Sequence, residues 1–391
     1  MIAVDILLIC LTLFGNALLC IHFFNHSHSR LVSRWVDKTL DIVIDIWFLV
    51  VPLGFLIWYC FAGRLLVEML SDFTPFFPML FVVVCLGNLV ITMGLLLARP
   101  QPDSPLALST NHTTRLDLGR QLGPSVCVDN PIVRRLAALP GNQILELNIH
   151  EKKIRIPRLP LALEGFSIVH LTDLHFTGVI GKPYFDEVIR HANELDADLI
   201  AITGDLIDNP KCFDWIDDTL GQLRARHGVY YVLGNHDMRI DSPALRRRLH
   251  SAGLITLGSR WTTLSIHGAT LVLAGNELPW FGPLVDMRDC PERDEEQLRV
   301  FLSHSPDQID WAVEHDADLM LAGHTHGGQI RLPWIGPLAS SSRMGSRYAG
   351  GTYDLSPTVL HVCRGISGTF PIRFNCPPEL ARLELHSAEA I

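Results

Sequence analysis

Three long apolar runs near the N-terminus constrain this chain more than any other feature. They cover residues 6–24, 46–62 and 76–98, and each is close to the roughly 20 apolar residues that a helix needs to cross a lipid bilayer. Lipid offers no partners to backbone N–H and C=O groups, so such runs are helical there. No lysine or arginine precedes the first run, unlike the start of a cleaved signal peptide. We therefore predict a membrane region over residues 1–98 with three transmembrane helices, in contact with the lipid bilayer.

The basic residues between the runs predict an orientation. The loop after the first run carries Arg30, Arg34 and Lys38, whereas the loop after the second carries only Arg64. Further arginines follow the third run. Loops that are rich in lysine and arginine stay on the cytoplasmic side of a membrane. We therefore expect the N-terminus outside and the large C-terminal part in the cytoplasm.

Beyond the apolar runs, short apolar strands alternate with amphipathic segments from residue 166 onward, which indicates an α/β domain. Residues 99–142 are rich in Pro, Asn, Thr and Gly, so we expect a linker there. A single folded domain is expected over residues 143–391, opening with a strand hairpin between residues 143 and 156. Helices are expected over residues 213–226 and 294–302.

The composition excludes one class of partner. The formal net charge is −9 and the sequence contains no basic block, so we expect no nucleic acid to bind through a broad basic face. The nine cysteines include no C-x-x-C pair and indicate no disulfide framework.

Five short motifs rich in Asp, His, Asn and Gly lie in the α/β region, and most of them directly follow a predicted strand. In open α/β sheets, ligands bind at the carboxyl ends of strands, so we expect these segments to converge. The motifs are Asp173-Leu174-His175, Gly204-Asp205, Gly234-Asn235-His236-Asp237, Ser303-His304-Ser305-Pro306 and Gly323-His324-Thr325-His326-Gly327-Gly328-Gln329.

These residue types predict a centre with two divalent metal ions. Such a centre needs nitrogen and oxygen ligands from several segments and one carboxylate that bridges the ions, for which Asp205 is the natural candidate. Mixed imidazole and carboxylate ligands suit Mn, Fe or Zn better than Ca. Each motif alone is weak evidence, because GD and GNHD are ordinary turn sequences. The prediction rests on all five motifs occurring together and in order.

The set of motifs closely resembles that of the calcineurin-like metallophosphoesterases, whose D-x-H, GD, GNH-D/E, H and GHxH positions are all filled. The resemblance covers about residues 166–385. It implies a four-layer sandwich of two mixed β-sheets flanked by helices. GHTHGGQI, LSHSPD and the segment 364–379 are similar to a bacterial subgroup that often carries N-terminal membrane segments. Some members of that subgroup hydrolyse the pyrophosphate of UDP-2,3-diacylglucosamine in lipid A synthesis, which implies a bacterial inner membrane as the location.

The resemblance also implies roles for individual residues. His236 would face the substrate as the catalytic acid, with Asp237 orienting its imidazole, and manganese would be the favoured ion. The sequence departs from the subgroup at Asn276-Glu277, where we expect another acidic turn. The metal ligands would be Asp173, His175 and His326 for one ion, Asn235, His304 and His324 for the other, and Asp205 between the two.

Contacts to the rest of the substrate are predicted from basic and apolar residues near the motifs. Lys182, Arg331 and Arg364 are candidates for binding it, although solvated surface charge is as common for each of them. The apolar loops 278–281 and 332–335, each with a tryptophan, either contact acyl chains or the bilayer surface, where tryptophan is favoured, or pack internally.

The favoured function is hydrolysis of a phosphodiester or pyrophosphate in a phosphorylated, lipid-linked small molecule. One alternative is a general phosphodiesterase for soluble nucleotides. Another is a membrane scaffold without catalysis, which the complete ligand set disfavours. The chain has no G-x-S-x-G motif, so a serine hydrolase has no support.

Overall fold

The computed structural model describes residues 2–30 and 34–388 and divides the chain into two compact units. The helical unit contains Met1–Pro100 together with Arg343–Arg347. The sandwich unit contains Gln101–Ser342 and Tyr348–Ile391.

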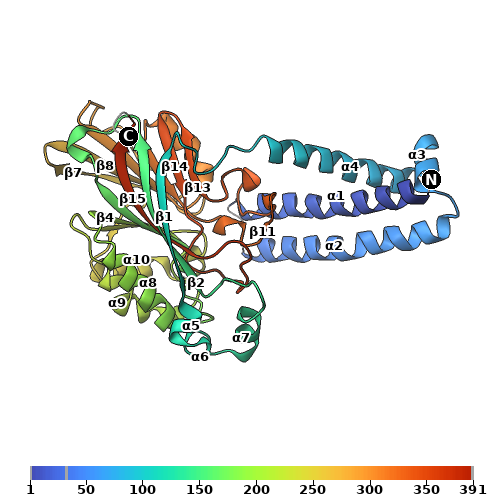
Figure 1. The fold of residues 1–391 in the computed structure, drawn as a ribbon, viewed down its shortest axis with the longest axis horizontal. Coiled ribbons are helices and arrows are strands. Elements are labelled where there is room, and N and C mark those ends of the chain that lie inside the picture. Colours follow the sequence, from blue (N-terminus) through green and yellow to red (C-terminus); the bar gives the residue numbers. More distant parts are fainter. Residues whose placement is uncertain (1, 31–33, 389–391) are drawn as a thin grey trace. The chain divides into compact units, whose positions relative to one another are not determined.

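The helical unit is built from α1 (Ile2–His28), α2 (Arg34–Ala62), α3 (Leu66–Asp72) and α4 (Phe76–Leu97). Helix α1 packs against both α2 and α4 (Figure 1). Each of the three apolar runs lies within a helix, and the segments long and apolar enough to cross a membrane are Ile2–His28, Lys38–Ala62 and Phe76–Leu97. Many apolar side chains on these helices are exposed, which suits a surface that faces lipid.

The sandwich unit contains a seven-stranded sheet in the order β1-β2-β15-β3-β4-β5-β6. Strands β3, β4, β5 and β6 are parallel to one another, while β15 lies between β2 and β3, parallel to β2 and antiparallel to β3. The strands are β1 (Leu108–Asp117), β2 (Glu146–Ile156), β3 (Ser167–Leu171), β4 (Leu199–Thr203), β5 (Val229–Val232), β6 (Ile255–Thr256) and β15 (Glu379–Ser387).

A second, six-stranded sheet has the order β13-β14-β10-β9-β8-β7, with four parallel strands in the middle and an antiparallel strand at each edge. Its strands are β7 (Arg260–Ile266), β8 (Ala269–Asn276), β9 (Gln297–Ser303), β10 (Leu319–Ala322), β13 (Gly351–Leu355) and β14 (Thr358–Val362). A small pair, β11 (Arg331–Leu332) and β12 (Gly336–Pro337), stands apart from both sheets.

The two sheets pack face to face and helices cover their outer faces, which confirms the expected four-layer sandwich. One apolar core lies between the sheets, and a second joins the first sheet to helices such as α8, which Figure 1 shows together with α9 and α10 on one side of that sheet. On the far side, Trp311 of α11 stacks on Phe301 of β9, with 4.9 Å between the ring centroids. The helices of this unit are α5 (Leu118–Leu122), α6 (Pro124–Cys127), α7 (Pro131–Ala137), α8 (Lys182–Glu194), α9 (Trp215–Asp218), α10 (Ser242–Ser251) and α11 (Ile309–Glu314).

Four expectations differ from the structure. Residues 99–142 are not a linker, because they contain β1, which pairs with β2 over its length. Residues 143–156 form no hairpin, because Glu146–Ile156 is one continuous strand, β2. The helix expected over residues 294–302 is wrong, since Gln297–Ser303 is the buried strand β9. Residues 213–226 contain only the short α9 and a 3₁₀ turn at Leu220–Gln222.

Candidate metal centre

Five strands deliver the predicted motifs to one place in the sandwich unit. Strands β3, β4 and β5 of the first sheet and β9 and β10 of the second each end within two residues of the start of a motif. Backbone hydrogen bonds join the resulting loops: Asp173 N–H donates to the Gly204 carbonyl at 3.0 Å, and Gly323 N–H donates to the His304 carbonyl at 2.9 Å. The carboxyl ends of both sheets therefore converge, as the sequence predicts.

The backbone of the ligand loops is strained. Five of the seven predicted metal ligands adopt a left-handed conformation that non-glycine residues rarely occupy, and such strain gathers at functional sites. Their φ values are 52° for Asp173, 46° for His175, 55° for Asp205, 68° for His324 and 50° for His326.

Glycine leaves the space that the ligands occupy. A Cβ atom on Gly204, whose φ is +94°, would lie 2.6 Å from Nδ1 of His304. A Cβ atom on Gly234 would overlap the Asp205 carboxylate and lie 2.7 Å from Nε2 of His304. The loops approach one another this closely only because these two positions have no side chain.

The first group of candidate ligands comprises Asp173, His175, Asp205 and His326, whose ligand atoms lie within 4.8 Å of one another. Nε2 of His175 is 3.5 Å from Oδ2 of Asp205 and 3.1 Å from Nε2 of His326. Nε2 of His326 is 3.4 Å from Oδ1 of Asp173. Two carboxylates and two imidazoles therefore point at one position.

The second group comprises Asp205, His304 and His324, and Asn235 joins it. Nε2 of His304 is 3.2 Å from Oδ2 of Asp205 and 3.2 Å from Oδ1 of Asn235. Nδ1 of His324 is also 3.2 Å from Nε2 of His304. Because Asp205 belongs to both groups, it has the position of a bridging ligand.

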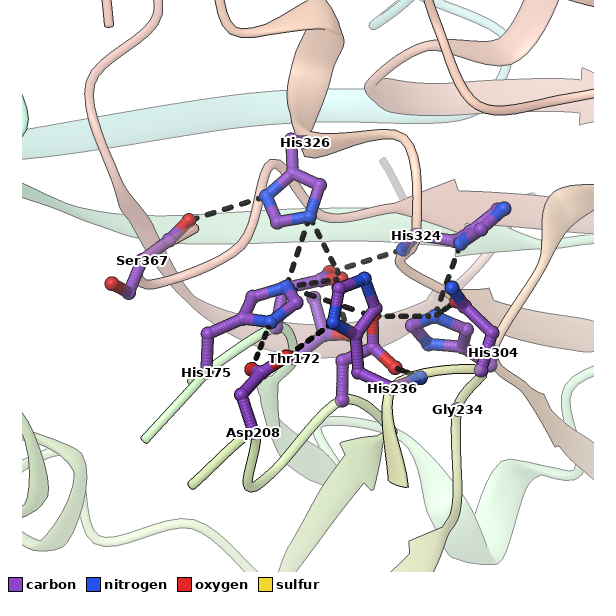
Figure 2. A network of polar contacts seen from close by, with 12 residues as sticks. Thr172, His175, Asp208, Gly234, His236, His304, His324, His326 and Ser367 are labelled. Atoms are coloured by element: carbon purple, nitrogen blue, oxygen red, sulfur yellow. Dashed lines mark hydrogen bonds and ion pairs between the residues drawn. The ribbon is translucent and has the colours of Figure 1, made fainter. Parts of the chain in front are cut away.

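Hydrogen bonds at the far side of three imidazoles fix which nitrogen faces the centre. Nδ1 of His175 donates to Asp208 at 2.7 Å, and Nδ1 of His326 donates to the Ser367 carbonyl at 3.2 Å (Figure 2). Nδ1 of His304 donates to the Thr203 carbonyl at 2.6 Å. Each ring thus keeps its Nε2 lone pair free, in the orientation that metal-binding histidines have.

The electrostatics of the site fit divalent cations. Burial would lower the pKa of His304, but the Asp205 carboxylate raises it to about 9. Burial would also raise the pKa of Asp205, yet His304 and His236 hold it well below its usual range. Oδ1 of the buried Asp173 has no hydrogen-bond partner among the described residues, an arrangement that is costly unless a cation is bound. The donor set and its charge therefore suit a pair of metal ions.

Asp208 is a functional residue that the sequence analysis missed. Its carboxylate binds Nδ1 of His175 through one oxygen and Nδ1 of His236 through the other, as Figure 2 shows. Burial opposes ionisation of Asp208, but these two histidines lower its pKa strongly. The only sequence signal is that Asp208 follows Asp205 by three residues, within the same turn after β4.

Asp237 does not orient His236, which corrects the sequence expectation. Its carboxylate instead accepts hydrogen bonds from the backbone N–H groups of Leu206, Ile207 and Gly234, at 2.9, 3.1 and 2.9 Å. Burial and the nearby Asp205 raise the pKa of Asp237 to about 7. Asp237 therefore links the Asp205 loop to the Asn235 loop.

The departure at Asn276-Glu277 also has a structural role. The buried Glu277 carboxylate accepts a 2.6 Å hydrogen bond from the backbone N–H of Leu233 and pairs with Arg246 at 2.5 Å. It thereby supports the turn that carries Asn235. In the following loop, the buried Trp280 ring lies 4.8 Å from the His324 ring and shields it from water.

The three expected substrate contacts lie outside the ligand cluster. The Lys182 ammonium pairs with Asp186, one helical turn further along α8, at 2.9 Å. The Arg364 guanidinium is largely buried and pairs with Glu379 at 2.8 Å. Arg331 lies in β11, next to a loop in which Trp334 is fully exposed.

Fold and site together define a metal-dependent hydrolase of phosphate esters. Residues 166–328 match the family model for calcineurin-like phosphoesterases. The uncharacterized metallophosphoesterase YkuE of Bacillus subtilis is 33% identical over 245 residues, which are 61% of this chain and 85% of that protein. Phosphodiesterase YaeI of Escherichia coli is 30% identical over 226 residues, which are 56% of this chain and 82% of that protein. UDP-2,3-diacylglucosamine pyrophosphatase LpxG of Chlamydia muridarum is 24% identical over 280 residues, which are 58% of this chain and 85% of that protein. The chain belongs to the calcineurin-like phosphoesterase family.

Proposed function

We propose that this protein is anchored in a membrane and hydrolyses a phosphodiester or diphosphate bond of a lipid-linked substrate, with manganese as the favoured metal. The observation that carries the proposal is the pair of ligand groups that share Asp205, in a chain that also has three helices long and apolar enough to cross a bilayer. Membership of the phosphoesterase family supports hydrolysis of a phosphate ester. The three apolar helices favour a substrate that lies in the lipid bilayer.

The protein's own residues have separate tasks in this reaction. Asp173, His175 and His326 would hold one ion, Asn235, His304 and His324 the other, and Asp205 both. When bound, two such ions lower the pKa of water and neutralise the charge that develops on a phosphoryl group. The buried Trp280 ring and the buried ligand side chains keep bulk water from the centre, which strengthens every charge interaction there.

His236 would donate the proton to the leaving oxygen. Its Nδ1 is tied to the Asp208 carboxylate, so the opposite nitrogen, Nε2, is the one that faces a substrate. An ionised Asp208 stabilises the protonated imidazole, and a positioned acid of this kind typically contributes about 10²–10⁴-fold to the rate.

Two features support a lipid-linked substrate. A relative named as a UDP-2,3-diacylglucosamine pyrophosphatase covers 58% of this chain, and the exposed Trp334 beside Ile335 and Leu332 offers apolar surface in the loop after the His326 motif. Tryptophan favours the interface between lipid and water. For the location, we propose a bacterial inner membrane with the sandwich unit in the cytoplasm.

The decisive experiment uses the full chain, purified in detergent and supplied with Mn²⁺. Its turnover of UDP-2,3-diacylglucosamine is compared with that of the deacylated analogue and of bis-p-nitrophenyl phosphate. We expect two ions per chain and a kcat/KM that falls at least tenfold without the acyl chains. Equal rates on the deacylated analogue would favour the phosphodiesterase for soluble nucleotides. Two bound ions with no turnover of any substrate, and no effect of His236→Ala, would favour the scaffold.

A further inference from the structure

A second polar cluster lies between the two sheets, beside the metal centre but without a role in the mechanism above. It begins at Lys152 in β2, crosses to His361 in β14, returns to His170 in β3 and ends at Thr203, the last residue of β4. Lys152 is 3% exposed and the other three residues are completely buried. Burial of so many polar groups in an apolar core is expensive, so the arrangement calls for an explanation.

The members of this cluster form an unbroken chain of contacts. Nζ of Lys152 is 3.3 Å from Nε2 of His361, and Nδ1 of His361 is 3.0 Å from Nδ1 of His170. Nε2 of His170 is 2.8 Å from the Thr203 hydroxyl. The Thr203 carbonyl then accepts the 2.6 Å hydrogen bond from the metal ligand His304.

The chain has a direction, because an ammonium group can only donate hydrogen bonds. Nε2 of His361 must accept from Lys152, so its proton sits on Nδ1. Nδ1 of His170 must then accept the hydrogen bond from His361. The ring proton of His170 therefore sits on its Nε2, which donates to the Thr203 hydroxyl. Lys152 thus fixes both tautomers from the far end of the chain.

The surroundings of the chain pair Lys152 with a carboxylate and keep both histidines neutral. Glu379 lies 3.2 Å from Nζ of Lys152, and its other oxygen accepts from Arg364 at 2.8 Å. Burial, together with the positive charge of Lys152, lowers the pKa of His361. Burial likewise lowers the pKa of His170, to about 3. The donor order therefore holds at neutral pH.

We propose that Lys152, His361 and His170 are positioning residues that fix Thr203, and through its carbonyl set the orientation of the metal ligand His304. This inference rests on the proposed function, since it concerns the same metal centre. Thr203 is held at its side chain by His170 while its carbonyl holds His304. A shift of Thr203 would move Nε2 of His304 away from Asp205 and Asn235. Outer contacts of this kind are worth roughly 10–100-fold in metal affinity.

Two pairs of variants test the proposal in the full chain. Thr203→Val removes the hydroxyl but keeps shape and carbonyl, and Thr203→Ser restores the hydroxyl. Lys152→Met removes the source of the chain. Its matched control is Lys153→Met, the next residue of β2, whose half-exposed side chain pairs with Glu384 instead.

The first measurement is Mn²⁺ affinity and stoichiometry by titration calorimetry, with the melting temperature of the metal-free protein taken alongside. We expect about tenfold weaker binding for Thr203→Val and Lys152→Met, and wild-type binding for Thr203→Ser and Lys153→Met. Wild-type affinity in a folded Thr203→Val protein would overturn the positioning role and leave the proposed function intact. A wild-type chain that binds no Mn²⁺ would instead refute the proposed function and this role with it.

The second measurement reads the tautomers directly. The ¹⁵N shifts of the ring nitrogens in metal-free protein should show the proton of His361 on Nδ1 and that of His170 on Nε2. Lys152→Met should abolish this fixed pattern, whereas a purely structural ion pair between Lys152 and Glu379 would leave the tautomers unchanged. Protonation of His361 on Nε2 in the wild type would contradict the proposed donor order.

Discussion

A single carboxylate, Asp208, ties a metal ligand and the proposed proton donor together. We expect Asp208→Asn to lower kcat about 100-fold, because the neutral amide no longer stabilises a protonated His236. Mn²⁺ binding should weaken about tenfold through the lost contact to His175. Steady-state kinetics and metal titration measure the two effects. The control is Asp241→Asn, since Asn caps α10 as well as Asp does; equal losses in both variants would refute the role of Asp208.

The glycine at position 234 gives a prediction about space. Gly234→Ala would place a methyl group against the Asp205 carboxylate and the His304 ring. We expect the variant to lose at least one of the two ions, as measured by metal analysis of the purified protein. Gly282→Ala is the matched control, because nothing lies within 4 Å of the added methyl group. Full metal occupancy in Gly234→Ala would show that the loops separate easily.

For the residues of the site, the sequence predicted which side chains come together but not which hydrogen bonds hold them in place. The seven expected ligands each lie in a short motif after a strand, so position in the fold follows from position in the chain. Asp237 was assigned to His236 because the two are adjacent, yet adjacent side chains in a turn point in different directions. Asp208 lies outside every motif, and only the three-dimensional turn after β4 brings it to His236.

Among the elements, the sequence did not predict strands β9 and β1. Every residue of β9 is buried, so it has no alternation of polar and apolar positions to distinguish it from a helix. The acidic residues before it resemble the first turn of a helix. The reason for β1 is the opposite one: it is an edge strand whose mostly polar side chains are exposed or partly exposed at all but one position. Both segments are strands because they pair with other strands of their sheets, β1 with β2 and β9 with β8 and β10, and this pairing is not visible in the local sequence.

Buried histidines in the strands β2, β3 and β14 should make the stability of the protein depend on pH. Burial lowers the pKa of His150 to about 4 and of His170 to about 3, and it lowers that of His361 too. The unfolded chain, with histidine pKa values near 6.5, therefore binds these protons first. The contribution of these three histidines to stability should be complete above about pH 6.5 and fall by about 1.4 kcal/mol per pH unit for each histidine as the pH drops towards 4.

Thermal melting between pH 4 and 7 measures this dependence on the metal-free protein. His150→Gln should reduce the slope of stability against pH by the contribution of one histidine, about 1.4 kcal/mol per pH unit, because glutamine does not titrate. The exposed His112 serves as the comparison, and His112→Gln should leave the slope unchanged. A melting temperature that is constant from pH 7 to 4 would contradict the prediction.

For the whole molecule, the three apolar helices make orientation testable. We expect a green fluorescent protein fused to the C-terminus to fluoresce and an alkaline phosphatase fused there to be inactive, since both report a cytoplasmic C-terminus. Alkaline phosphatase fused after Arg64, in the loop expected outside, should be active. The reverse pattern would place the sandwich unit on the other side of the membrane.

The position of β15 has a consequence for biosynthesis. This strand, which follows the other strands of both sheets in the chain, inserts between β2 and β3 in the interior of the seven-stranded sheet. Until β15 has been made, β2 and β3 expose unpaired backbone edges, a state in which chains aggregate readily. The apolar helices are made before any strand, and in the proposed membrane they would separate the nascent chains from one another. Tethering through these helices would thus protect a domain that only β15 can close.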